Sequence, residues 1–343
     1  MKYIKLFEDF KVEDIPQSEP QFTLWMMKNA PKAVYNPQEW FEEELGKSIP
    51  NWAFIGYIIK ELGLANRLSV PKGAMEEFTM QEIDKDILNS YSLLYWAVIE
   101  ENVELVKILI ECGVNLDAKS YKGRIPLQRA IFKGYTKIAK MLIEGGANLD
   151  SCDDRKMTPL HYAISYNRQE IVKMLIERGA DVNAKDDDKF SPLHWAVYKG
   201  NTEIFKMLID AEADLNAMDN GLETPLHVAI GNNRLEIAKM LIDAGADLNA
   251  KEKKKRTPLY LAILNFRPEL AKALIDAGAD LNVRDNRRRT PLHWAAENSV
   301  EITKMLIDAG AELDVLDYNR ETPWDLTTPF MQGNVPELNP NNA

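Results

Sequence analysis

Short apolar segments at helical spacing recur along most of this chain. One of them, 203–209, reads Glu-Ile-Phe-Lys-Met-Leu-Ile, and its apolar side chains fall on one face of a helix. Upstream of it stands a second marker, a proline followed by leucine, which opens a shorter apolar stretch. Proline suits the first turn of a helix, because the amide hydrogen that it lacks would be unpaired there. The pattern predicts pairs of short antiparallel helices joined by loops.

The proline-leucine step returns every 33 residues, and this period predicts the architecture. The prolines that carry it are Pro126, Pro159, Pro192, Pro225, Pro258 and Pro291. Leu93-Leu94 is a degraded copy one period earlier, and Pro323-Trp324 is a copy 32 residues after the last proline. One helix pair cannot bury its apolar faces alone, so neighbouring pairs must stack. We therefore expect an all-α solenoid of helix-loop-helix units.

Two short motifs inside the period identify the kind of unit. Thr-Pro-Leu-His stands at 158–161, 224–227 and 290–293, and as Ser-Pro-Leu-His at 191–194. The second helix ends in Gly-Ala-Asp-Val-Asn or Gly-Ala-Asp-Leu-Asn at 179–183, 245–249 and 278–282. These residues resemble the ankyrin repeat. The resemblance implies seven repeats plus a truncated eighth over 91–327, with β-turn fingers and first helices lining a concave face. In this family that face and the finger tips usually bind another protein.

The two ends of the chain lie outside the repeats. Residues 1–90 contain no repeat, and we expect there a small helical N-terminal domain or cap of unknown type. Residues 328–343 form a polar segment rich in Asn and Pro, for which we predict a disordered tail.

Composition favours a cytoplasmic protein. The N-terminus has no uninterrupted apolar core of a signal peptide, and no apolar run is long enough to span a bilayer. The only cysteines, Cys112 and Cys152, stand in different repeats, so they form no disulfide framework and suit a reducing compartment. We expect a monomer, although the sequence does not determine the oligomeric state. The net charge of −11 argues against nucleic-acid binding over the whole surface.

The chemistry-bearing residues predict a protein without catalysis, metal or cofactor. All four histidines, His161, His194, His227 and His293, occupy the same motif position. The family resemblance assigns them backbone hydrogen bonds that tie adjacent turns together. The second helices carry a ladder of lysines, but each has an acidic residue three positions before or four after it, as in Glu203-Lys206. This pairing is typical of a solvated helix face rather than of a nucleic-acid stripe.

Two consecutive fingers, 251–256 and 284–289, are strongly basic, and together they carry +7. Like charges on adjacent repeats repel, so stability does not explain them. We name as partner-binding candidates Lys253, Lys254, Lys255, Arg256, Arg287, Arg288 and Arg289. The matching chemistry is an acidic protein surface. Solvated loops without a role, a phosphorylated ligand and nucleic acid remain alternatives.

A second group of candidates lies at the ends of the first helices, where the sequence varies most between repeats. The members are Phe132, Lys133, Tyr166, Tyr198 and Lys199. Tyr166 and Tyr198 stand on neighbouring repeats, and tyrosine buries a large rigid area at small entropic cost. Exposed tyrosines without a role are the alternative interpretation.

These observations predict a non-enzymatic regulator or effector that binds, sequesters, blocks or recruits another protein through its concave face and finger tips. One alternative is a binder of nucleic acid or another polyanion through the two basic fingers. Another is a targeting arm for an activity in 1–90, although that segment contains no histidine and no cysteine. No membrane contact is expected.

One position departs from the repeat in a way that has a consequence for stability. Six repeats place glycine after the second helix, and repeat four has Glu212 there. Glycine at a helix C-terminus commonly takes a left-handed conformation, which costs other residues about 1 kcal/mol. We predict a left-handed Glu212, and a more stable protein when it is replaced by glycine.

Overall fold

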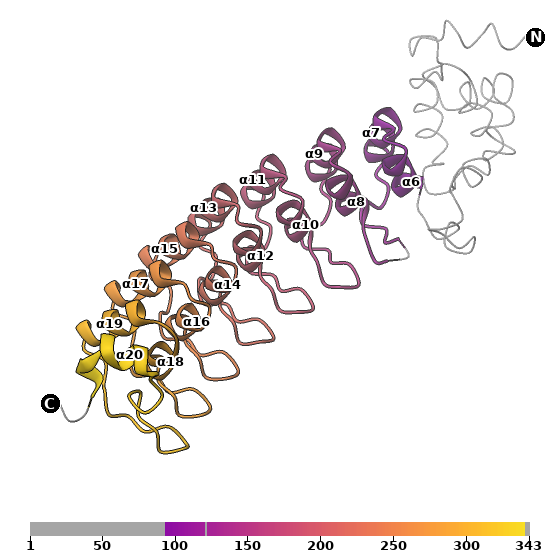
Figure 1. Cartoon of the computed structure of the whole chain (residues 1–343). Coiled ribbons are helices and arrows are strands. Elements are labelled where there is room, and N and C mark those ends of the chain that lie inside the picture. Colours follow the sequence, from indigo (N-terminus) through magenta and orange to yellow (C-terminus); the bar gives the residue numbers. More distant parts are fainter. Residues whose placement is uncertain (1–92, 121, 340–343) are drawn as a thin grey trace, which may run out of the picture. The chain divides into compact units, whose positions relative to one another are not determined.

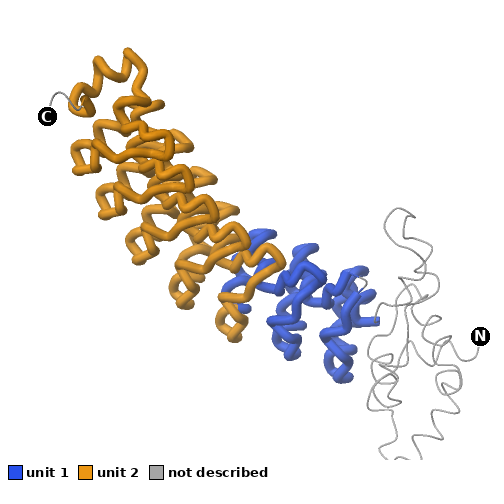
Figure 2. Tube along the Cα trace, turned by 90° about the horizontal axis from the view of Figure 1, so that it is seen from below, with its two compact units in different colours: residues 1–175 blue, residues 176–343 orange. Residues whose placement is uncertain are grey.

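The computed structural model describes residues 93–120 and 122–339. The expectation of a helical N-terminal domain in 1–90 lies outside these residues. The described residues fall into two compact units, one ending at Leu175 and the other beginning at Ile176 (Figure 2). Within the part of the chain that the structure describes, all regular elements are helices, which confirms the all-α prediction.

The first unit contains three helix pairs, the last of which reaches into the second unit. The helices are α6 (Leu93–Ile99), α7 (Val103–Glu111), α8 (Pro126–Lys133), α9 (Thr136–Glu144), α10 (Pro159–Ser165) and α11 (Gln169–Glu177). The first helices α6 and α8 pack against each other, as do α8 and α10, and α7 packs on α9 (Figure 1).

The second unit repeats the same arrangement four times and ends in two short elements. Its helices are α12 (Pro192–Lys199), α13 (Thr202–Asp210), α14 (Pro225–Gly231), α15 (Leu235–Asp243), α16 (Pro258–Leu264), α17 (Pro268–Asp276), α18 (Pro291–Asn298), α19 (Val300–Asp308), α20 (Pro329–Asn334) and η4 (Pro336–Leu338). Helices α12, α14, α16 and α18 pack in one row. The loops between successive pairs project to one side of this row as the predicted fingers (Figure 1).

The proline-leucine step opens each first helix and fills the core. In α10, α12 and α16 a threonine or serine before the proline accepts a hydrogen bond from the third helical residue, which caps the helix. The leucine of every step is fully buried. The alanine three residues later, such as Ala196 or Ala229, is also fully buried, and its small side chain permits close approach of the neighbouring helix.

Hydrogen bonds between repeats hold the stack together. In His194 the Nδ1 atom accepts a hydrogen bond from the Ser191 N–H, so Nε2 carries the proton and donates to the Glu223 carbonyl at 3.1 Å. His227 and His293 make the equivalent bonds at 3.4 and 3.3 Å, which confirms the predicted structural role. Repeat two has Gln128 instead, whose amide donates to the Ser151 and Met157 carbonyls.

A second ladder between repeats runs through the Asp-Leu-Asn motif, and the sequence reading did not predict it. The side-chain oxygen of each motif asparagine accepts a hydrogen bond from a backbone N–H of the next repeat. Asn216 binds the N–H of Asp247, and Asn249 binds that of Asp280, at 2.8 and 2.9 Å. The repeated asparagine is therefore explained by a contact with the neighbouring repeat.

Glu212 adopts the predicted left-handed conformation, with φ of 59°. The glycines at the equivalent places, such as Gly179 and Gly245, have φ of 84° and 88°. Left-handed residues also occur at the finger tips, where Lys255 and Arg288 both have φ of 61°. Non-glycine residues in this region are uncommon, so the finger tips were not predicted to be left-handed.

The C-terminal segment differs from the disordered tail that composition predicts. Thr328 caps α20, whose first residue is Pro329, and η4 follows directly. Met331, Val335 and Leu338 are buried. Their spacing of four and then three residues is helical, so a few well-spaced apolar side chains outweigh the polar average of the segment. None of the helices in the described residues is long and apolar enough to cross a membrane.

Candidate protein-interaction surface

The fingers from 185–190 to 316–321 are short hairpins, each closed by one acidic residue at its base. In the 284–289 finger, the Asp285 N–H donates to the Arg289 carbonyl at 2.9 Å, and the Arg288 N–H donates back to the Asp285 carbonyl at 3.0 Å. The Asp285 carboxylate accepts hydrogen bonds from the backbone N–H groups of Arg287 and Arg289. The 185–190, 218–223 and 316–321 fingers repeat this arrangement around Asp186, Asp219 and Asp317.

The acids at the base of the basic fingers are engaged inside the fold. Glu252 is buried and its carboxylate binds the Arg256 guanidinium at 2.8 Å. Asp285 also accepts a hydrogen bond from the Tyr260 hydroxyl, and burial together with this contact raises the pKa of Tyr260. Burial alone would raise the pKa of the Asp317 carboxyl, but hydrogen bonds from the Glu321 N–H and from Arg289 hold it below its usual value.

Two of the predicted partner-binding arginines are engaged in the same way. The Arg256 side chain is only 19% exposed and pairs with Glu252. The Arg289 side chain is 12% exposed, pairs with Asp317 at 3.1 Å, and lies over the ring of Trp294 at 5.6 Å. Their charges stabilise the finger bases, so they differ in setting from the other five basic residues.

The remaining five basic residues lie at the finger tips. We call them the basic fingertip surface: Lys253, Lys254, Lys255, Arg287 and Arg288. All five are exposed, and among the described residues none of them forms an ion pair. The two fingers are joined by a backbone hydrogen bond from the Asn286 N–H to the Lys254 carbonyl at 3.2 Å. The stacked fingers therefore bring these five side chains to one edge of the second unit.

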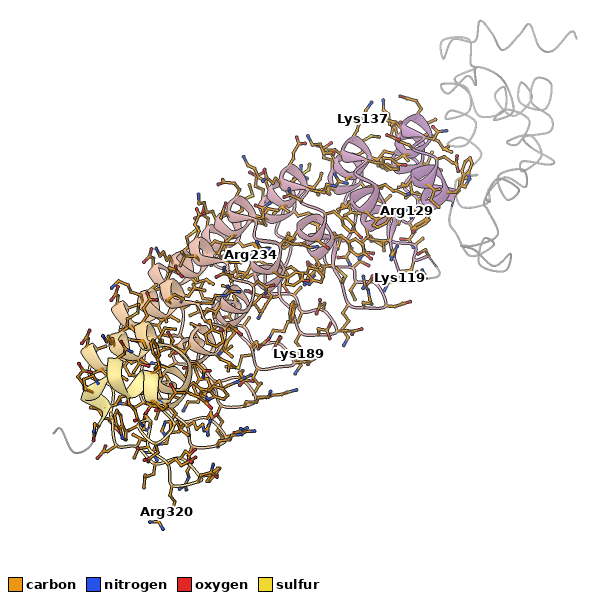
Figure 3. The ribbon with its side chains drawn as sticks, in the orientation of Figure 1. Lys119, Arg129, Lys137, Lys189, Arg234 and Arg320 are labelled. Carbon is orange, nitrogen blue, oxygen red and sulfur yellow. The ribbon has the colours of Figure 1, made fainter. Side chains whose placement is uncertain are left out.

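The structure adds a third finger to this surface. The Tyr318 N–H donates to the Arg287 carbonyl at 3.1 Å, which joins the 316–321 finger to its neighbour. Arg320 stands at its tip and points away from the helices (Figure 3). Arg284, Arg288 and Arg320 line a recess of about 540 Å³ between the two fingers. The Arg288 guanidinium lies 5.1 Å from the centre of the Tyr318 ring in this recess.

Sequence reasoning missed Arg320 and Tyr318 because the last repeat is one residue short of the period. The glutamate and tryptophan that follow in Glu321-Thr322-Pro323-Trp324 also depart from the motif. The remaining signal is the acidic residue five positions before the threonine of the motif. Asp317 stands five residues before Thr322, as Asp285 stands before Thr290, and this register would have located the third finger.

The candidates on the first helices form two separate clusters. In the first unit the rings of Phe132 and Tyr166 meet edge to face at 5.0 Å, and Lys133 lies 5.8 Å from the Phe132 ring. In the second unit Tyr198 contacts Trp195 at 6.3 Å, and Lys199 lies over both rings. Tyr166 is 40% exposed and Tyr198 is 48% exposed. Because they belong to different units, their expected proximity stays a prediction.

The histidines and the second-helix lysines are occupied by the fold. Burial lowers the pKa of His194, His227 and His293. Among the described residues, no group of three or more His, Cys, Asp or Glu side chains is placed to hold a metal ion. Four of the ladder lysines lie within ion-pair distance of an acid; they are Lys107, Lys140, Lys206 and Lys272.

Comparison with known proteins agrees with this geometry. The family model described as "Ankyrin repeats (3 copies)" matches residues 67–153, 94–186, 184–252 and 248–317, which together span more than half of the chain. The ankyrin repeat domain of Bcl-3, described as a unique member of the IkappaB protein family, is 25% identical, with a TM-score of 0.58. The comparison covers 63% of this chain and 99% of that one.

A second solved structure is similar to the same extent. The human ASB11 ankyrin repeat domain is 26% identical over 63% of this chain and 98% of that one, with a TM-score of 0.54. No curated protein sequence matches the chain. Domains built from these repeats are generally protein-protein interaction modules, and the fold is a typical non-enzymatic scaffold.

Proposed function

Since the chain belongs to the ankyrin-repeat family, we propose that it is a non-enzymatic module that captures an acidic protein partner on the basic fingertip surface. A rigid surface that exists before binding loses little conformational freedom on association. Capture on such a surface sequesters the partner, blocks its other contacts or recruits it. The partner's acidic residues meet Lys253, Lys254, Lys255, Arg287 and Arg288.

One observation supports this proposal above the others. Five exposed cations gather on two hydrogen-bonded fingers and form no ion pair with any other described residue, while the acids of the same fingers are engaged at the base. On the second helices of the same unit, the exposed Lys206 and Lys272 each lie within ion-pair distance of an acid. Unpaired like charges repel one another, and an external acidic group relieves this repulsion. Arg256 and Arg289 contribute by holding the finger bases in place.

An acidic protein fits this surface better than nucleic acid does. The fingers 251–256 and 284–289 carry +7, but the whole chain carries −11. An extended polyanion reaches beyond two fingers and meets the negative remainder of the surface, whereas a short acidic segment does not. The exposed Asp187 and Asp188 tips, two fingers earlier, belong to this negative remainder.

The aromatic clusters on the first helices supply a second contact in this proposal. Tyr166 with Phe132 and Lys133, and Tyr198 with Lys199, present partly exposed rings beside a cation. Tyrosine is enriched among the residues that dominate binding energy at interfaces. We expect truncation of either tyrosine to weaken binding if the partner reaches past the fingers.

The experiment is an affinity capture from nuclease-treated lysate with mass spectrometry, using the full chain and two variants of equal net charge. The fingertip variant changes Lys253, Lys255, Arg287 and Arg288 to glutamate. The matched control changes Lys206, Lys239, Lys272 and Lys304 of the second helices to glutamate.

The proposal predicts a partner with an acidic segment that the wild type and the control retain and the fingertip variant loses. Equal retention by all three proteins contradicts it and transfers the site to the first-helix clusters. A partner that appears only when nuclease is omitted supports the nucleic-acid alternative instead.

A further inference from the structure

We propose that the partner's acidic segment is extended in the polyproline II conformation and crosses the tips of the last three fingers, with one acidic side chain every third residue. The acid at one end enters the recess lined by Arg284, Arg288 and Arg320. This inference rests on the proposed function and specifies its ligand. It begins from the regular spacing of the fingers.

The last three fingers repeat one geometry at a fixed interval. Their tip residues Lys255, Arg288 and Arg320 have φ of 61°, 61° and 66°. Each finger is a tight hairpin turn, and a backbone hydrogen bond of 3.1 or 3.2 Å joins neighbouring fingers. Adjacent hydrogen-bonded chain segments lie about 4.8 Å apart and each finger contributes two segments, so equivalent tips recur at intervals of about 10 Å.

Polyproline II presents side chains on one side at nearly this interval in the shortest chain segment. Polyproline II has three residues per turn and rises about 3.1 Å per residue, so every third side chain points the same way at intervals of about 9 Å. A β-strand alternates its side chains and offers intervals of about 7 or 13 Å on one face. An α-helix reaches a comparable interval, about 10.5 Å, only at every seventh residue, so it needs about twice as many residues to place three acidic side chains on three fingers.

The recess closes the site at the 316–321 finger and limits the charge that it accepts. Three arginines line it, against Glu312, Asp314 and Asp317. Asp317 is already paired with Arg289, which leaves a small positive excess. Such an excess matches one carboxylate and does not match a polyphosphate. The Tyr318 ring beside Arg288 provides an apolar wall for the rest of the ligand's side chain.

The opposite limit of the site is set by the earlier fingers. The 218–223 finger has Leu222 at its tip, and the 185–190 finger exposes Asp187 and Asp188. The 218–223 finger has no cation at the position of Lys255, and the 185–190 finger has Lys189 there, with φ of 59°, next to the two aspartates. An acidic segment therefore has three consecutive favourable fingers, preceded by one without a tip cation and by one whose net charge is negative.

The test compares two fluorescent synthetic peptides of identical composition by anisotropy with the full chain. The periodic peptide consists of four Glu-Pro-Ala triplets. The clustered peptide contains the same residues with its four glutamates adjacent. We expect the periodic peptide to bind at least about tenfold more tightly, because its side chains are already spaced for the fingers.

Two variants locate the ligand. Arg320→Glu lowers the affinity of the periodic peptide by about tenfold or more, because Arg320 lines the recess and its side chain forms no ion pair within 93–120 and 122–339. Lys304→Glu on α19, an exposed residue with the same change in charge, leaves the affinity within about twofold. A circular dichroism spectrum and urea midpoint for each variant show that the fold is retained.

The possible outcomes separate this inference from the proposed function. Equal affinity for both peptides overturns the three-residue register and leaves an acidic partner in place. If neither peptide binds, yet the lysate partner depends on the fingertips, the extended ligand is wrong and the proposed function stands. If neither peptide binds and no partner depends on the fingertips, both this inference and the proposed function are wrong. Tighter binding of a single-stranded oligonucleotide than of the periodic peptide also overturns both.

Discussion

The base and the tip of the 284–289 finger both carry arginine, but the two arginines are used differently. At the base, Arg289 pairs with Asp317, and the ring of His293 links two turns. At the tip, Arg288 stands one residue away from Arg289 without an acidic partner among the described residues. Of two neighbouring arginines, one can stabilise the fold while the other is exposed for binding. The net charge of a finger alone therefore does not measure its capacity for binding.

The largest expected effect at the base is a loss of stability in mild acid. Burial lowers the folded-state pKa of His194, His227 and His293 below 6.5. The unfolded chain therefore binds more protons below that pH, and the free energy of unfolding falls as pH decreases from 6.5. Three such histidines contribute at most about 4 kcal/mol per pH unit together. Urea midpoints between pH 7.5 and 5.5 measure this slope.

Gln128 provides the control for that measurement, because it makes the histidine's hydrogen bonds without titrating. His227→Gln should remove one histidine's share of the slope and change stability little at pH 7.5. A slope that is unchanged in this variant would assign the acid sensitivity to other groups.

The next effect separates the two adjacent arginines. Arg289→Ala leaves the buried Asp317 carboxylate without its guanidinium partner and should lower the free energy of unfolding by about 1–3 kcal/mol. Arg288→Ala should change it by about 0.5 kcal/mol or less, because the side chain is exposed. For the affinity of the periodic peptide we expect the opposite order, so Arg288→Ala should weaken binding more than Arg289→Ala does. Equal stability of the two variants would remove the distinction between base and tip.

A smaller effect comes from left-handed residues. Glu212→Gly should raise the free energy of unfolding by about 1 kcal/mol, since its φ of 59° is unfavourable for a side chain. Lys255→Gly, with φ of 61°, should stabilise the finger similarly while weakening peptide binding. Urea unfolding measures both. An unchanged or lower midpoint for Glu212→Gly would contradict the strain argument.

The smallest effect is expected on the second helices. The exposed Lys206–Glu203 pair, three residues apart, should contribute only about 0.2–0.5 kcal/mol. Lys206→Ala should therefore be almost neutral for stability and for capture of the partner. A loss of binding in this variant would show that the helix face, and not the fingertips, is the contact surface.

The sequence predicted the helices and the finger positions well because the period averages over many copies. A pattern such as Thr-Pro-Leu-His both caps a helix and buries its leucine, so local and tertiary requirements agree at these positions. The prediction failed in the C-terminal segment, which is not a copy of the repeat. Composition suggested a disordered tail after 328, but Met331 and Val335 are buried at helical spacing.

The sequence identified the two basic fingers as candidates, but it did not show which of their side chains are engaged by the fold and which are exposed. Runs of lysine and arginine identified the 251–256 and 284–289 fingers. Sequence could not distinguish Arg288 from Arg289, because the acid that engages Arg289 lies 28 residues away at Asp317 in the next finger. Arg320 was missed for a related reason, since its place beside Arg284 and Arg288 depends on how neighbouring repeats stack.

The amino-acid sequence by itself therefore determined the repeat, its helix pairs and the left-handed Glu212, because each follows from local geometry repeated at a constant period. The histidine contacts were expected from the family resemblance. Tertiary structure decided which charges remain available. An ion pair forms between side chains that are distant in sequence and adjacent in space, and its partners are known only once the repeats are stacked. The same stacking brings three fingers into register and creates the recess that Arg320 completes.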